Sequence, residues 1–179
     1  GNDGNISKEK LESCINSDLA NNYGNLCQRV ISFNEKNLNL KIPETDKFNQ
    51  DDLKVLNVFE KNFNKIIDYI DNQDINSYVH FIVNQLFSAN KYFNDQEPWK
   101  KKADLKRLNS IVYVSLELIR KISIMLYPII PETSLKVLKI FNIEEKQINF
   151  NSIVNNDFLK KSTKINKISI LFKKIQKND

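Results

Sequence analysis

Glycine, proline and histidine are scarce in this sequence, and their scarcity limits what the chain can be. Its 179 residues include three glycines, four prolines and one histidine. A protein of many tight hairpins or a glycine-rich phosphate-binding loop needs more glycine than this. Long helices joined by few turns are therefore favoured. The hydrophobic fraction of 41% and the charged fraction of 27% are typical of one soluble globular domain.

Long apolar runs and paired cysteines are also lacking. No apolar run approaches the roughly 20 residues of a transmembrane helix, and residues 1–5 do not resemble a signal peptide. Cys14 and Cys27 fall in one predicted helix, about 20 Å apart along its axis and too far for a disulfide. With a single histidine, a zinc site is not expected either. We predict a cytoplasmic chain that binds no membrane and no metal.

The net charge of +5 is unevenly distributed. Residues 160–179 hold seven lysines and one aspartate. A second basic cluster lies in the middle of the chain and consists of Lys100, Lys101, Lys102, Lys106 and Arg107. Because such clusters are more often solvated surface than binding sites, they permit polyanion binding without establishing it.

Apolar residues recur at helical spacing through most of the chain. The predicted helices run from after Ser7 to Asn34, from Gln50 to Asp71, from Asp74 to Phe93, from Asp104 to Leu126 and from Glu132 to Phe141. The apolar faces are expected to include Leu53 and Ile70 in the second helix and Val83 and Phe87 in the third. Glu35–Asn49 and Asn94–Trp99 are predicted loops, and Pro98 disfavours helix at the residue before it.

These patterns predict an all-α fold, an antiparallel bundle of about five helices with a less regular C-terminal tail. The fourth helix is apolar nearly all round between Ile111 and Leu126, so it should lie at the centre. Residues 1–143 are predicted to form the bundle. Residues 144–179 form a basic tail that packs on the bundle or on another domain, and Ile168–Phe172 is either a short strand or a last helical turn.

Catalytic groups are poorly represented. His80, the only histidine, falls inside the third predicted helix and is best explained as a structural or surface residue. Lys160–Lys164 faintly resembles an ATP-binding lysine-serine loop, but it lies in a lysine-rich tail, and no partner motif accompanies it. No GxxxxGK[ST] loop is present. We therefore expect no catalytic residue in this chain.

Three features suggest RNA binding instead. Asn25 and Arg29 lie four residues apart at the margin of the first helix's apolar stripe, where an amide and a guanidinium could bond the edge of a splayed-out base. On spacing alone, a polar network tying helices together, with Gly24 permitting close helix contact, is the simpler explanation of this pair. Trp99, the only tryptophan, falls on a predicted loop and is either a lid over the core or a base-stacking platform. The basic cluster that follows it supplies candidate phosphate contacts, which add affinity but no sequence specificity.

Several stretches resemble the anticodon-binding domain of methionyl-tRNA synthetases, in the family's order. They are Asn16–Leu26 followed by Arg29, Ser88–Tyr92 followed by Pro98-Trp99, and Tyr127–Thr133. The resemblance covers about Asn2 to Phe141. It departs from the family at Leu171–Ile175, which lacks the usual proline, and at Tyr23, where an aliphatic residue is commoner.

The resemblance implies a helical bundle that binds the CAU anticodon stem-loop of methionine tRNAs through Asn25, Arg29 and Trp99. It further implies a monomeric ligase whose catalytic domain precedes Gly1. That enzyme would use ATP, Mg²⁺ and, as a further candidate, Zn²⁺, whereas this fragment would bind no cofactor and be non-catalytic. Two alternatives stay open: the matching domain of a leucine, isoleucine, valine or cysteine synthetase, and a helical protein-interaction module, which an exposed apolar patch around Trp99 would favour.

Overall fold

The computed structural model describes residues 18–45 and 47–168, and in that part the regular structure is helical, without a β-strand. Seven α-helices and three short 3₁₀ helices are defined there. The α-helices are α2 (Ala20–Leu38), α3 (Gln50–Leu56), α4 (Val58–Lys61), α5 (Phe63–Asp71), α6 (Ile75–Gln96), α7 (Leu105–Leu126) and α8 (Pro131–Ile140). The 3₁₀ helices are η2 (Pro98–Lys100), η3 (Glu145–Gln147) and η4 (Phe150–Val154). The all-α bundle expected from the sequence is confirmed.

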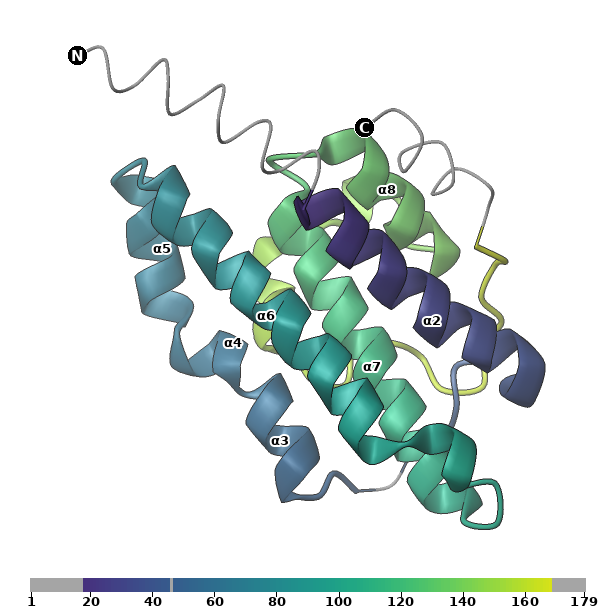
Figure 1. Cartoon of the computed structure of the whole chain (residues 1–179). Coiled ribbons are helices and arrows are strands. Elements are labelled where there is room, and N and C mark those ends of the chain that lie inside the picture. The colour runs from purple at the N-terminus through teal and green to yellow at the C-terminus, as the bar shows by residue number, and fades with distance from the viewer. Residues whose placement is uncertain (1–17, 46, 169–179) are drawn as a thin grey trace.

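Helix α7 forms the centre of the bundle. It contacts α2, α3, α6, α8 and η4, and every residue from Ser110 to Leu126 is buried. It runs antiparallel to α2 and α6, which lie side by side along it (Figure 1). The Asp104 side chain caps its first turn by accepting a hydrogen bond from the Arg107 N–H at 3.2 Å. The predicted position of this helix is therefore correct.

The single helix predicted over Gln50–Asp71 is instead divided into α3, α4 and α5, with breaks at Asn57 and Asn62. The backbone N–H of Asn57 still donates to Leu53 and that of Asn62 to Val58, so the chain stays coiled while its direction changes (Figure 1). This bending explains why the predicted apolar face is only partly buried. Leu53 and Ile70 are exposed, although other members of that face are buried.

Helices α2 and α6 both run further than predicted. Asn39 ends α2 with a φ of 55°, and Glu97 ends α6 with a φ of 46°. In both cases a left-handed residue stops the helix. The expected loop beginning at Asn94 therefore starts only at Glu97. On α6, Val83 and Phe87 are exposed rather than in the core, because the face that meets α2 and α7 is supplied by their neighbours. The predicted start of the first helix after Ser7 lies outside the described residues.

The segment after α8 follows the surface of the bundle as far as Ile168, which leaves most of Ile168–Phe172 outside the described residues. The Ile42 N–H donates to the Thr163 carbonyl at 2.8 Å, and the Ser162 N–H donates to the Ile42 carbonyl at 2.7 Å. These bonds join the segment to the α2–α3 loop.

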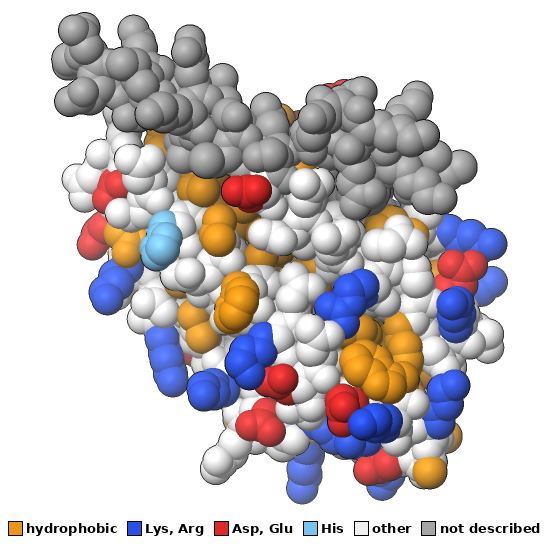
Figure 2. Space-filling model, in the orientation of Figure 1, with side chains coloured by type: hydrophobic (Ala, Val, Ile, Leu, Met, Phe, Trp, Pro, Cys, Tyr) orange, Lys and Arg blue, Asp and Glu red, His pale blue; other side chains and the backbone are white. Residues whose placement is uncertain are grey.

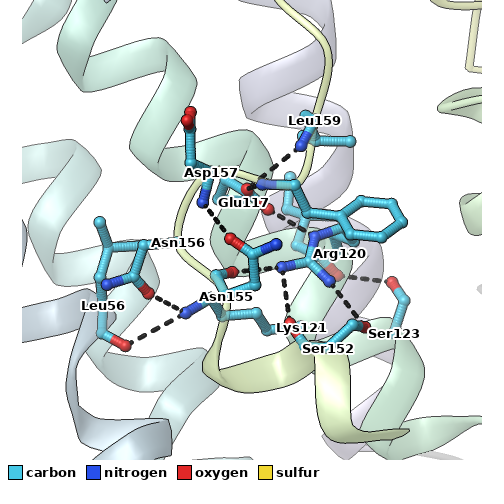
Figure 3. A network of polar contacts seen from close by, with 12 residues as sticks. Leu56, Glu117, Arg120, Lys121, Ser123, Ser152, Asn155, Asn156, Asp157 and Leu159 are labelled. Atoms are coloured by element: carbon cyan, nitrogen blue, oxygen red, sulfur yellow. Dashed lines mark hydrogen bonds and ion pairs between the residues drawn. The ribbon is translucent and has the colours of Figure 1, made fainter. Parts of the chain in front are cut away.

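Glu117, buried in α7, holds the turn at residues 158–159 from inside the bundle (Figure 3). Its Oε1 accepts the backbone N–H groups of Phe158 at 2.6 Å and Leu159 at 3.3 Å. Its Oε2 pairs with the Nε of Arg120 at 2.5 Å. A buried carboxylate is tolerated here because both of its oxygens have partners.

Arg120 continues this network toward η4. Its terminal nitrogens donate to the Ser152 hydroxyl at 3.1 Å, the Ser152 carbonyl at 3.1 Å and the Asn155 carbonyl at 2.7 Å. The guanidinium also lies 4.5 Å from the centre of the Phe158 ring. One buried arginine therefore fixes both η4 and the chain that follows it.

Lys121 makes the third contact of α7 with this region. It donates to the Leu56 carbonyl at the end of α3, at 3.3 Å, and to the Asn156 side chain. Asn156 in turn donates to the Asn57 side chain at 2.8 Å. Burial lowers the pKa of Lys121 to about 7. The negative charge of Glu117 opposes this shift, and the positive charge of Arg120 contributes to it.

Candidate nucleic-acid interface

Arg29 lies at the junction between α2 and α6 and is bound to both amides that α6 presents there. Its Nη1 donates to Oδ1 of Asn90 at 3.3 Å, and its Nη2 donates to Oδ1 of Asn94. The guanidinium carbon lies 5.2 Å from the centre of the Phe93 ring, within the range of a cation–π contact. Because arginine has five N–H donors, two bonds leave others for a ligand.

Trp99 reaches the same region from the short 3₁₀ helix η2. Its ring lies 5.9 Å from that of Phe93 at an interplanar angle of 68°, an edge-to-face contact. The left-handed Glu97 and the buried Pro98 turn the chain just before it. The Trp99 side chain stays 42% exposed. Phe93 thus contacts both Arg29 and Trp99 and brings together two residues that are 70 positions apart in the sequence.

An open groove of about 410 Å³ extends from Arg29 along α2 and α6. From α2 it is lined by Asn22, Asn25, Gln28 and Arg29, and from α6 by Val83, Phe87 and Asn90. Asn25 therefore shares one surface with Arg29, as the four-residue spacing predicted. The lining combines side-chain amides and one guanidinium with two exposed apolar groups. Figure 2 shows hydrophobic side chains lying among basic ones on the face of the molecule that α2 and α6 form.

The lysines of the predicted basic cluster lie beside Trp99, at the junction between α6 and α7. Lys102 and Lys106 are exposed and Lys101 is half-buried. Lys100 is exposed and pairs with Glu97 at 3.0 Å. An ion pair as exposed as this one contributes little stability, so a phosphate could compete for the lysine.

Arg107 differs from these four lysines. Its Nη1 and Nη2 donate to the two carboxylate oxygens of Asp52 at 2.9 Å each, and Nη2 also donates to Gln96 at 2.7 Å. Asp52 is buried and also accepts the Tyr92 hydroxyl at 2.5 Å. The sequence pattern assigns Arg107 to the phosphate-contacting cluster. It gives no sign of the pairing with Asp52, which is 55 positions away in the sequence. The structure assigns this arginine to an internal contact between α7 and α3.

Sequence patterns did not single out Phe87, Phe93 and Asn94 as members of this surface. A signal does exist in hindsight, because Phe87, Asn90 and Asn94 follow one another at helical spacing. It becomes decisive only when α2 is known to pack on that face. Elsewhere in the described residues, no group of three or more His, Cys, Asp or Glu side chains is placed to hold a metal ion. His80 is exposed on α6, and the helices of residues 18–45 and 47–168 include none with the length and apolar character needed to cross a membrane.

Comparisons with known proteins agree with the fold and extend it. The family described as the anticodon-binding domain of methionyl tRNA ligase matches residues 42–179. The methionine–tRNA ligase of Mycobacterium leprae is 34% identical over 158 residues, which are 86% of this chain and 29% of that protein. The enzyme of Thermotoga maritima is 32% identical over an alignment of 181 positions, which covers 100% of this chain and 29% of that protein.

Solved structures give the same result. The free methionyl-tRNA synthetase of Mycobacterium tuberculosis superimposes with a TM-score of 0.80 at 29% identity, covering 90% of this chain and 33% of that one. The same enzyme with bound methionyl-adenylate also superimposes with a TM-score of 0.80, covering 32% of that chain.

The fold and the site together define a helical-bundle domain that presents an indole, a guanidinium and several amides on one surface. This chain belongs to the family of anticodon-binding domains of methionyl-tRNA ligases. It spans about 30% of the length of the curated relatives it matches. The family match begins at residue 42, after Asn25 and Arg29, whereas the Thermotoga alignment covers the whole chain.

Proposed function

We propose that this domain selects methionine tRNAs for a full-length methionine–tRNA ligase by binding their CAU anticodon. Trp99 stacks on the first anticodon base, while Asn25 and Arg29 bond to base edges. The observation that carries the proposal is the contact of Phe93 with both Arg29 and Trp99, at 5.2 and 5.9 Å. A half-exposed indole and a guanidinium with further donors thus contact the same aromatic ring.

The chemistry of this surface suits an unpaired loop rather than a duplex. Bases splayed out of a loop can stack on aromatic rings and bond along their exposed edges. Amides and guanidinium groups bond such edges in pairs. The groove beside Arg29 carries three further amides, on Asn22, Asn25 and Gln28, a type of group that can both donate to and accept from a base edge.

The four lysines near Trp99 are proposed to contact phosphates of the same loop. These are Lys100, Lys101, Lys102 and Lys106. Such contacts orient the RNA and add affinity without choosing a base. We leave Arg107 out of this set because its charge is already paired with the buried carboxylate of Asp52.

The activity itself belongs to the proposed full-length enzyme. It would join methionine to tRNA with ATP and Mg²⁺, with Zn²⁺ as a candidate structural metal, in the cytoplasm and as a monomer. Within it, the residues of this domain take no part in bond making. Their contribution is to bind the correct tRNA in one orientation.

Aminoacylation kinetics of the full-length enzyme provide the test. We expect kcat/KM to fall when the first anticodon base of a methionine tRNA transcript is replaced, with the rest of the tRNA unchanged. Trp99→Ala should lower kcat/KM for the CAU transcript by roughly 5- to 150-fold, the value of one stacked base. It should also remove most of the preference between the two transcripts.

Leu105→Ala is a suitable control, because Leu105 is 63% exposed at the start of α7 and has no proposed contact with a base. Its kcat/KM should stay within about two-fold of the wild-type value, as for most surface substitutions. Equal aminoacylation of both transcripts by the wild-type enzyme would refute anticodon selection by this domain.

A further inference from the structure

Phe87 is the most exposed large hydrophobic side chain in the described part of the chain, at 71%. It lies on α6, whose core positions are filled by neighbours such as Leu86 and Ala89. Burying a phenylalanine side chain stabilises a fold by about 1.5–3 kcal/mol. Phe87 contributes little of this stabilisation, because its ring stays exposed. An aromatic ring presented in this way therefore needs an explanation outside the packing of the bundle.

The surroundings of Phe87 are those of a binding site for a flat polar ligand. The ring lines the groove between α2 and α6 with Val83, opposite Asn22, Asn25 and Gln28. An aromatic floor beside amides offers stacking and edge hydrogen bonds together, the two interactions by which proteins hold an unpaired nucleobase. None of the residues lining the groove is acidic, so an approaching phosphate meets no carboxylate there.

The groove is continuous with the surface proposed to bind the anticodon. Arg29 and Asn90 line it and are themselves hydrogen-bonded to each other. Phe87 lies six residues before Phe93 on α6, roughly 9 Å along the helix axis, and Phe93 contacts the Trp99 ring. The two proposed platforms, Phe87 and Trp99, therefore adjoin the same part of α6, which suits two bases of one loop.

We infer that Phe87 is a second stacking platform, which holds a nucleobase of the tRNA loop other than the one on Trp99 while amides of α2 bond its edge. This inference rests on the proposed function and deepens it. One base lies on Trp99, another lies on Phe87, and Arg29 stands between them.

The test uses the full-length methionine–tRNA ligase that contains this domain and methionine tRNA transcripts. Phe87→Ala should lower kcat/KM for the CAU transcript by roughly 5- to 150-fold, the range of one lost stack. Phe87→Tyr keeps the ring and should stay within about three-fold. Since the side chain is 71% exposed, Phe87→Ala should leave the unfolding midpoint within about 2 °C, as expected of a surface substitution.

Transcripts with an abasic site at one loop position at a time identify the base. The loss caused by Phe87→Ala should disappear for one abasic position, because no base is left there to stack. The loss caused by Trp99→Ala should disappear for a different position. A wild-type value of kcat/KM for Phe87→Ala, together with a loss for Trp99→Ala, overturns the second platform and leaves the proposed function standing.

Two other outcomes also decide the matter. A Phe87→Ala loss that persists on every abasic transcript overturns stacking and indicates a contact with another part of the enzyme or with a protein partner. Wild-type kinetics that ignore the anticodon altogether overturn the proposed function, and the second platform with it.

Discussion

Arg107 and Asp52 form a bidentate ion pair that joins the first turns of α7 and α3, with both N–O distances at 2.9 Å. The Tyr92 hydroxyl on α6 donates to the same carboxylate, and so does the Asn49 N–H that precedes α3. Burial raises the pKa of Asp52, but the hydrogen bonds from Arg107 and Tyr92 outweigh it and hold that pKa below its usual value. Three helices therefore meet at one carboxylate, close to the lysines beside Trp99.

Asp52→Asn should lower the free energy of unfolding at pH 7 by about 2–4 kcal/mol, because Arg107 loses its buried partner. A carboxyl group with a lowered folded pKa contributes stability above its unfolded pKa of about 3.9 and loses it as the pH falls through the folded value. The difference between wild type and variant should therefore shrink below pH 4. Urea denaturation at pH 7 and pH 3 measures both values.

Asp51→Asn is the matched control for this carboxylate, since Asp51 is the exposed neighbour of Asp52. It should change the free energy of unfolding by no more than about 0.5 kcal/mol. A similar small effect for Asp52→Asn at pH 7 would show that the pair contributes no net stability.

Lys102→Ala should weaken tRNA binding by the full-length enzyme without changing its choice of anticodon. Removing one phosphate contact lowers the slope of log affinity against log salt by about 0.7 for a single strand. The measurement is a titration between 50 and 200 mM salt with CAU and altered transcripts. Lys65→Ala, at an exposed position on α5, serves as the control and should leave the slope unchanged. An unchanged slope for Lys102→Ala would remove this lysine from the phosphate-contacting set.

Glu117→Ala should be among the most destabilising substitutions in the chain. It leaves the guanidinium of Arg120 buried without its carboxylate and removes the acceptor of the Phe158 and Leu159 N–H groups. Breaking a buried pair in this way costs about 3–5 kcal/mol. Chemical denaturation measures the loss, and limited proteolysis should cut residues 155–165 faster than in the wild type.

Glu117→Gln keeps an acceptor oxygen but not the charge, so its loss should be smaller. If Glu117→Ala and wild type resist proteolysis equally, the network shown in Figure 3 does not hold this segment in place.

Lys121→Met should remove a pH dependence of stability. Burial lowers the pKa of Lys121 to about 7, so the folded chain releases a proton that the unfolded chain keeps up to about pH 10.4. The free energy of unfolding should therefore rise between pH 7 and about pH 9, by up to roughly 1.4 kcal/mol per pH unit. Lys121→Met should lack this rise.

The difference between wild type and variant at pH 6.5 and pH 8.5 isolates this group from others that titrate nearby. Lys54→Met, at an exposed position on α3, should give a profile parallel to that of the wild type. Parallel profiles for wild type and Lys121→Met would show that Lys121 titrates normally.

Helix α7 illustrates what the sequence makes predictable. Its N-cap, its length and its central position follow from Asp104, from the apolar run after it and from Pro128 beyond its end. These are local or compositional features. The division of α3, α4 and α5 is not predictable in the same way, because groups distant in the sequence stabilise it. Lys121 bonds the last carbonyl of α3, and Asn156 bonds the Asn57 side chain at the first break.

The candidate site also combines features that local sequence predicts with features that depend on distant contacts. The spacing of Asn25 and Arg29 on one helix predicts that they share a surface, and they do. The partners of Arg29 on α6 could not be predicted, because they depend on which face of α6 meets α2. Likewise, the helical pattern assigned Phe87 to the core, although the burial of α6 is decided by packing rather than by period alone.

Phe93 has a consequence for how errors spread across the site. One ring contacts both Arg29 and Trp99, so a displacement of Phe93 would move both side chains at once. If the proposed function holds, a base that fits badly against the indole would then also weaken the contact that Arg29 makes with its neighbour. Discrimination would in that case fall on adjacent bases together and not on each base separately.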